Sequence, residues 1–147
     1  MSHLIGSYDA SGPIIDVWIG VSEPRARALS AKHLPVPSSI RVPFLIDTGA
    51  DTTMVNEDLM RSLGIPATGA RDIVGSTTHT DPTTCDCYAV AFELRSSAEA
   101  PMVVPALEVL ARPFFNVSIY GLIGRDVLDR LHLTMGGRRF RLDWGPA

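Results

Sequence analysis

One aspartate in this sequence follows a short apolar run and opens a segment typical of a tight turn. Residues 44–46 (FLI) lead directly into residues 47–50 (DTGA). An apolar run of this kind predicts a buried strand, whose end would place the Asp47 carboxylate where access to water is restricted. Burying a carboxylate costs free energy unless the group is paired, protonated or used in chemistry. Asp47 is therefore a candidate catalytic residue; the alternative is a solvated turn aspartate, because Asp, Thr and Gly are common in turns.

A second segment near the end of the chain has a related pattern. Residues 121–128 read GLIGRDVL, so that two apolar residues precede Gly124, Arg125 and an acid. The apolar positions that follow share one helical face, which predicts a short helix beginning at residues 124–126. The sequence thus places a second glycine-containing turn before a helix.

Other catalytic chemistries have little support. Four histidines lie far apart in the sequence, without an H-x-x-H or HExxH pattern: His3, His33, His79 and His132. The two cysteines, Cys85 and Cys87, cannot complete a tetrahedral zinc site alone, and we interpret them as small strand residues in a reducing compartment. No G-x-S-x-G motif of a serine hydrolase is present. We therefore expect no metal ion and no cofactor.

The composition favours one soluble globular domain spanning residues 1–147. Hydrophobic residues make up 46% of the chain and charged residues 20%, and the net charge is −3. Without a basic surplus, neither nucleic acid nor an anionic membrane is an expected partner. The N-terminus lacks the basic and apolar regions of a secretory signal, and no apolar stretch is long enough to span a bilayer. These features predict a cytoplasmic protein.

The elements around the two motifs are predicted to be mostly strands. Apolar, β-branched runs predict strands at residues 13–21, 41–46, 85–94, 102–110 and 114–122. Residues 71–84 are polar, with one glycine near their centre, and are interpreted as the exposed part of a β-hairpin. A last hairpin is expected from residues 131–135 and 138–144, with Gly136-Gly137 as its two-residue turn.

Helices are expected to be few and short. Asn56 is a favourable N-cap for a helix over residues 57–63, and Gly64 is its stop signal. The other helix is the one that begins at residues 124–126. A long connection, residues 23–39, has room for a further short helix near residues 25–32. The sequence therefore predicts an all-β fold with two short helices, each directly after a special turn.

The two motifs together resemble those of the retroviral and retropepsin-like aspartic proteases. In that family D-T-G-A-D comes early, a flap hairpin follows, and an apolar-apolar-Gly-Arg helix start lies near the end. The resemblance covers roughly residues 13–144 in the right order. It implies a small closed β-barrel-like acid-protease fold with a flap hairpin. The long C-terminal hairpin is closer to cellular and bacterial single-domain members than to viral ones.

The resemblance assigns roles to residues of the first motif. Asp47 matches the catalytic aspartate, and Thr48 matches a residue whose hydroxyl reaches across a dimer to the partner's turn. Gly49 matches a position where the backbone approaches the substrate closely, which a residue without Cβ allows. Ala50 completes the turn.

The resemblance also assigns a supporting set and a flap. Asp51 and Arg125, with Gly124 beside them, match a buried pair that joins the active-site turn to the C-terminal helix; the alternative is two independent surface charges. The expected flap tip lies at three residues: Val74, Gly75 and Ser76. An ordinary surface hairpin is the competing interpretation. The chain departs from the viral pattern at Asp126, where those enzymes carry an amide, and in having a flap with only one glycine.

A single D-[ST]-G occurs in the chain. Aspartic proteolysis needs two carboxylates that share one proton, so that one can donate to the scissile carbonyl while the other activates water. The simplest completion is a two-fold homodimer in which Asp47 faces its symmetry mate. We therefore expect a homodimeric aspartic endopeptidase acting on peptides or proteins. The alternative is a catalytically inactive retropepsin-fold module for dimerisation or peptide binding.

Overall fold

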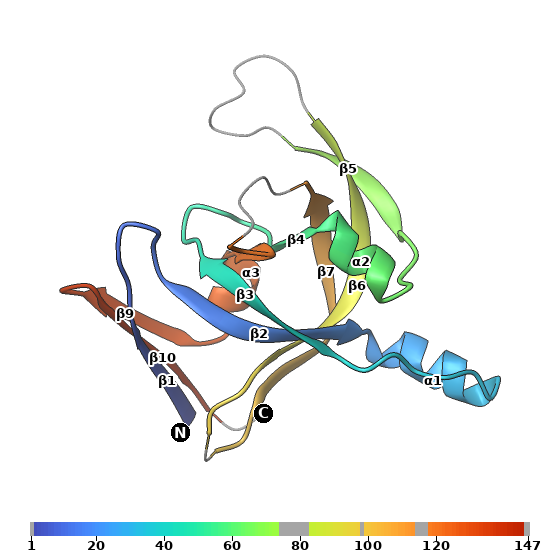
Figure 1. Ribbon diagram of the computed structural model, residues 1–147, viewed down its shortest axis with the longest axis horizontal. Coiled ribbons are helices and arrows are strands. Elements are labelled where there is room, and N and C mark those ends of the chain that lie inside the picture. The colour runs from blue at the N-terminus through green and yellow to red at the C-terminus, as the bar shows by residue number, and fades with distance from the viewer. Residues whose placement is uncertain (1, 74–82, 98, 114–117, 146–147) are drawn as a thin grey trace.

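The computed structural model describes residues 2–73, 83–97, 99–113 and 118–145, and it consists mainly of strands (Figure 1). The strands are β1 (Ser2–Ser7), β2 (Ile14–Val21), β3 (Ile40–Ile46), β4 (Met54–Asn56), β5 (Gly69–Ile73), β6 (Thr83–Leu94), β7 (Met102–Arg112), β8 (Gly121–Ile123), β9 (His132–Gly136) and β10 (Arg139–Trp144). The helices are α1 (Glu23–Ala31), α2 (Glu57–Ser62) and α3 (Arg125–Leu128). The expected all-β class is therefore correct.

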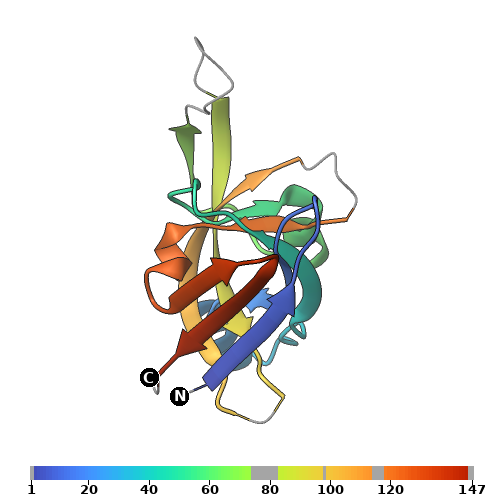
Figure 2. The same cartoon turned by 90° about the vertical axis from the view of Figure 1, so that its left-hand side faces the viewer.

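Six of the strands close into a barrel. The larger sheet has the order β2-β3-β8-β4-β7-β6-β5. An additional antiparallel pairing of β2 with β6 closes the six strands from β2 to β6 in this order into a barrel. β5 lies outside the barrel and pairs antiparallel with β6. The smaller sheet has the order β1-β10-β9 and lies beside the barrel (Figures 1 and 2). Closure leaves the barrel strands without free edges, because each finds a partner on both sides.

The barrel interior is filled by alternate residues of the strands. On β2, Val17 and Ile19 are fully buried, as the period of two in a strand requires. Phe44 of β3 and Phe92 of β6 are also fully buried, and their rings meet edge to face with centroids 6.3 Å apart. β3 carries Asp47 at its end, so the apolar side chains that precede the aspartate anchor its strand in the core.

The helices differ from the prediction in number. The described residues contain three helices rather than two. Ser22 caps α1 by accepting from the backbone N–H of Arg25 at 3.4 Å, but no residue of α1 is buried. A helix without a buried face shows no apolar period, so the sequence offered only the weak indication near residues 25–32. For α2 the predicted cap is confirmed: Asn56 Oδ1 accepts from the backbone N–H of Asp58 at 2.9 Å.

The strands differ from the prediction in several places. β1 and β4 were not predicted, although β1 pairs along its whole length with β10. The turn of the last hairpin is Gly137-Arg138, not Gly136-Gly137, because these two residues have the positive φ angles of 57° and 61° that such a turn requires. Of the strand expected at residues 114–122, only β8 forms among the described residues.

The hairpin expected around residues 71–84 is partly visible. β5 and β6 pair antiparallel from Gly69 opposite Cys87 to Ile73 opposite Thr83, and they project from the barrel (Figure 2). The predicted tip, with Val74, Gly75 and Ser76, lies outside the described residues.

The two cysteines lie near the base of this hairpin. Cys85 and Cys87 are both buried and unbonded, and they share one face of β6. They pack against Leu110, with Met54 and Ile73 at the edge of this small cluster. Burial raises the pKa of both thiols, which keeps them protonated. This arrangement agrees with their interpretation as small apolar strand residues.

Candidate active site

The site is built around the turn that follows β3. The backbone N–H of Asp47 donates to the carbonyl oxygen of Ile123 at 3.0 Å, and the N–H of Ala50 donates to the carbonyl oxygen of Asp47 at 3.2 Å. These bonds continue the parallel pairing of β3 with β8, in which Ile46 lies opposite Ile123. The end of a buried strand thus fixes the position of the Asp47 backbone.

The Asp47 carboxylate is half-buried and held through one oxygen. Its Oδ1 accepts from the backbone N–H of Gly49 at 2.9 Å. No hydrogen bond from the described part of the chain reaches Oδ2. A Cβ at Gly49 would lie 3.2 Å from Asp47 Oδ1, a tight contact that would crowd the carboxylate. Thr48 and Gly49 are exposed beside it.

The turn before α3 lies directly against this first turn. The backbone N–H of Arg125 donates to the carbonyl oxygen of Ala50 at 2.8 Å, and that of Asp126 donates to the carbonyl oxygen of Asp51 at 3.3 Å. The Arg125 guanidinium reaches back and donates to the carbonyl oxygen of Thr48 at 2.8 Å. The two segments singled out in the sequence are therefore in direct contact, although they lie far apart along the chain.

The expected buried pair of Asp51 and Arg125 does not form within this chain. Both residues are exposed, and no ion pair joins them in the part of the chain that the structure describes. Asp51 contacts the second turn through its backbone carbonyl oxygen, and the guanidinium of Arg125 binds the Thr48 carbonyl oxygen instead. Arg125 still links the two turns, but through a backbone acceptor.

Gly124 is required by a close approach of backbones. A Cβ built on it would lie 2.6 Å from the carbonyl carbon of Thr52 and 2.9 Å from the backbone nitrogen of Thr53. These atoms belong to the chain that follows the Asp47 turn, and they cannot rotate away as a flexible side chain could. Any side chain at position 124 would push the two turns apart.

Gly124→Ala is therefore expected to destabilise the protein by about 1–3 kcal/mol, the usual cost of overpacking a close contact. Thermal unfolding followed by circular dichroism measures the change. Gly136→Ala is the matched control, because a Cβ at Gly136 meets nothing within 4 Å and should leave the melting temperature nearly unchanged. Equal stability of the two variants would contradict the close approach.

Thr53 and Asp126 belong to the site, but neither was identified as a site residue from the sequence. Thr53 is completely buried and binds the second turn from the end of the loop that follows Asp47. Its hydroxyl donates to Asp126 Oδ1 at 2.7 Å and accepts from the backbone N–H of Gly124 at 3.1 Å. The only signal in the sequence was the acid at Asp126, noted as a departure from the viral amide. Thr53 lies just before β4, and a single threonine there forms no pattern that the sequence could reveal.

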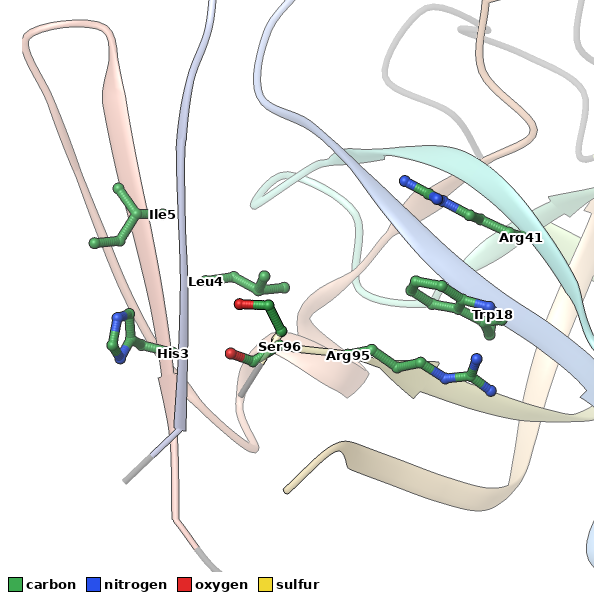
Figure 3. A pocket seen from close by; sticks show the side chains of 8 residues that line it. His3, Leu4, Ile5, Trp18, Arg41, Arg95 and Ser96 are labelled. Carbon is green, nitrogen blue, oxygen red and sulfur yellow. The ribbon is translucent and has the colours of Figure 1, made fainter. Parts of the chain in front are cut away.

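The hollows described for this chain lie away from Asp47. None of the five hollows that we describe is lined by Asp47. The largest, about 570 Å³, lies between β1 and β2, and Leu4, Trp18 and Arg95 are among its walls (Figure 3). Two guanidinium groups flank the Trp18 ring there, those of Arg41 at 5.4 Å and Arg95 at 4.4 Å from its centroid. This hollow shares no residue with the two turns.

Among the described residues, no three or more His, Cys, Asp or Glu side chains gather in a way that could hold a metal ion. No helix in the described ranges is long and apolar enough to cross a membrane.

Comparison with known proteins identifies similar folds. A family model described as aspartyl protease matches residues 38–127. The structure of a retropepsin-like aspartic protease from Rickettsia conorii superposes with a TM-score of 0.63 at 11% sequence identity, covering 97% of this chain and 91% of the other. The protease of EIAV, solved with the inhibitor HBY-793, aligns with a TM-score of 0.47 at 16% identity, covering 84% and 92%. No curated protein matches the sequence. The matched region contains both turns and confirms the predicted acid-protease fold.

Proposed function

This chain belongs to the aspartyl protease family and has a retropepsin-like fold, and from that premise we propose that it is a homodimeric aspartic endopeptidase. The observation that carries the proposal is the Asp47 carboxylate at the end of β3. One of its oxygens is held by the backbone N–H of Gly49, and no hydrogen bond from the described residues reaches the other. A carboxylate fixed in this way suits a group that must exchange protons with water and substrate.

A second chain is needed because the reaction uses two carboxylates. The sequence contains one D-[ST]-G, so a single chain supplies one catalytic aspartate. In a two-fold dimer Asp47 would face the same residue of the partner. Two carboxylates that lie so near each other cannot both be ionised. One of them therefore stays protonated and donates to the scissile carbonyl oxygen. The ionised one takes a proton from water, which attacks the carbonyl carbon.

One feature of the chain supports this assembly. Thr48 is exposed next to Asp47, where its hydroxyl could reach the turn of a partner chain. Val74, Gly75 and Ser76 are proposed to cover the substrate from the hairpin of β5 and β6. Gly49 would let a peptide backbone approach the catalytic turn closely.

The proposal is tested by offering the purified chain a peptide library between about pH 4 and pH 7, the range in which a carboxylate pair exchanges its proton. New termini are identified by mass spectrometry. We expect the chain to cleave peptides. A peptide with a hydroxymethylene group in place of the scissile amide should inhibit this cleavage, and a metal chelator should leave it unchanged. Cleavage lost on chelation would contradict the mechanism. Tight binding of the inhibitor without any cleavage would favour an inactive peptide-binding module.

A further inference from the structure

Thr53 is a buried residue whose hydrogen bonds join the loop after Asp47 to the start of α3. Its backbone N–H donates to both carboxylate oxygens of Asp126, at 3.1 and 3.0 Å, and its hydroxyl donates to Oδ1 at 2.7 Å. The same hydroxyl accepts from the N–H of Gly124, and the carbonyl oxygen of Thr53 accepts from the N–H of Leu110 at 3.1 Å. With no exposed surface, Thr53 could not replace any of these bonds with water.

The carboxylate of Asp126 accepts several of these bonds. It accepts from the N–H and the hydroxyl of Thr53, and also from the N–H of Val127 at 2.9 Å. A carboxylate is suited to this position because it accepts at every lone pair and has no donor that needs a partner. Hydrogen bonds to a charged group are roughly twice as strong as those between neutral groups.

These bonds hold one end of the catalytic loop. The loop over residues 47–53 is attached at its start, where the N–H of Asp47 donates to Ile123, and at its end, where Thr53 binds Asp126 and Gly124. Between these points, the carbonyl oxygens of Ala50 and Asp51 accept from the second turn. The direction in which Asp47 leaves β3 therefore depends on both attachments.

We propose that Thr53 and Asp126 are positioning residues for catalysis, which set how far Asp47 projects towards the partner chain. This role rests on the proposed function, because it concerns the distance between the two aspartates. In a two-fold dimer any displacement of the turn occurs in both chains, so the separation of the carboxylates changes by contributions from both. Displacements of about 1 Å in an active site can cost about a hundredfold in rate.

A purely structural role would have a different signature. Loss of a buried hydrogen bond lowers stability wherever it occurs, and most of all when a partner is left unsatisfied. A positioning role predicts in addition that the folded, dimeric variant binds substrate normally and turns it over slowly. The separation of kcat from KM distinguishes the two roles, provided that the variant is measured as a fully formed dimer.

The experiment compares Thr53→Val with Thr53→Ser. Valine has nearly the shape of threonine but lacks the hydroxyl, whereas serine retains it. Sedimentation first establishes the concentration at which each variant is dimeric, and kcat and KM are then measured with a peptide that the wild type cleaves. We expect Thr53→Val to lose about tenfold to a hundredfold in kcat with little change in KM, as for a misplaced catalytic group. Thr53→Ser should remain within about threefold of the wild type.

The carboxylate is tested with Asp126→Asn and Asp126→Ala. Asparagine keeps one oxygen that can accept from the N–H and the hydroxyl of Thr53, whereas alanine keeps none. We expect kcat to fall in the order wild type, Asp126→Asn, Asp126→Ala. Should Thr53→Val fail to fold, this second series carries the test.

Two outcomes would overturn the inference, and they differ from failure of the proposed function. Equal kcat for dimeric Thr53→Val and Thr53→Ser, or a change in KM alone, would assign these residues a structural role only. A wild-type chain that cleaves no peptide would overturn the proposed function, and this role with it. If the wild type is active, failure of the positioning role can therefore be distinguished from failure of the proposed function.

Discussion

Replacement of Asp47 by asparagine is expected to lower kcat by about a thousandfold or more, because the substitution removes the carboxylate that transfers the proton. An asparagine side chain keeps an oxygen that can accept from the N–H of Gly49, the bond that now holds Asp47 Oδ1 at 2.9 Å. The turn should therefore keep its shape while its acid–base group is lost. The measurement is kcat on a single peptide substrate, with circular dichroism to verify the fold.

Asp9 provides a matched control for this substitution. Its Oδ1 accepts from the N–H of Ser11 at 2.8 Å, which is the same local arrangement as at Asp47 and Gly49. Asp9 is exposed, and it precedes β2 rather than following a buried strand of the barrel. Asp9→Asn makes the same chemical change in the same kind of turn and should leave kcat unaltered. Comparable activity of Asp47→Asn and the wild type would contradict the proposed aspartic mechanism.

Mixing the wild-type chain with Asp47→Asn is expected to suppress its activity. If each active site takes one aspartate from each chain, a mixed dimer holds one carboxylate instead of two. Under random exchange of subunits, an excess of about ninefold of the variant leaves only about a tenth of the wild-type chains in wild-type dimers. Activity per wild-type chain should therefore fall by about tenfold. The chains are mixed, given time to exchange, and assayed against the same amount of wild type alone.

The control for this experiment is mixing with Asp9→Asn. That variant keeps Asp47, so its mixed dimers retain both carboxylates and activity should rise with the added chains. Activity that depends only on the amount of wild-type chain, whatever the excess of Asp47→Asn, would show that a chain acts without its partner's aspartate. The proposed dimer would then not be the catalytic unit.

Local patterns predicted much of the fold. β2 and β3 are apolar and β-branched on their buried faces, and α2 has a favourable cap in Asn56, so each could be recognised without its neighbours. β1 and α1 were harder to recognise, because α1 buries no residue and β1 gains its order by pairing with β10. The order of β1 depends on a partner that is distant in the sequence, whereas α1 has no buried face and so shows no apolar period.

The candidate site divides in the same way. Asp47 and Gly49 were identified because the strand, the acid and the turn lie in one short segment. Arg125 was expected to bind the Asp51 carboxylate, yet it binds the carbonyl oxygen of Thr48, an acceptor that every residue has. A sequence pattern reports the types of side chains and says nothing of which backbone group a guanidinium will reach.

The sequence by itself determined the candidate catalytic residue and its turn and predicted a second aspartate from a partner chain, since these depend on residue types within a few positions and on a count of motifs. Only the tertiary structure decided how the two turns meet. Thr53 and Asp126 are in contact because β8 lies between β3 and β4, which brings the start of α3 against the loop after Asp47. The close approach at Gly124 has the same origin, because the space beside a residue is set by the chain that packs against it.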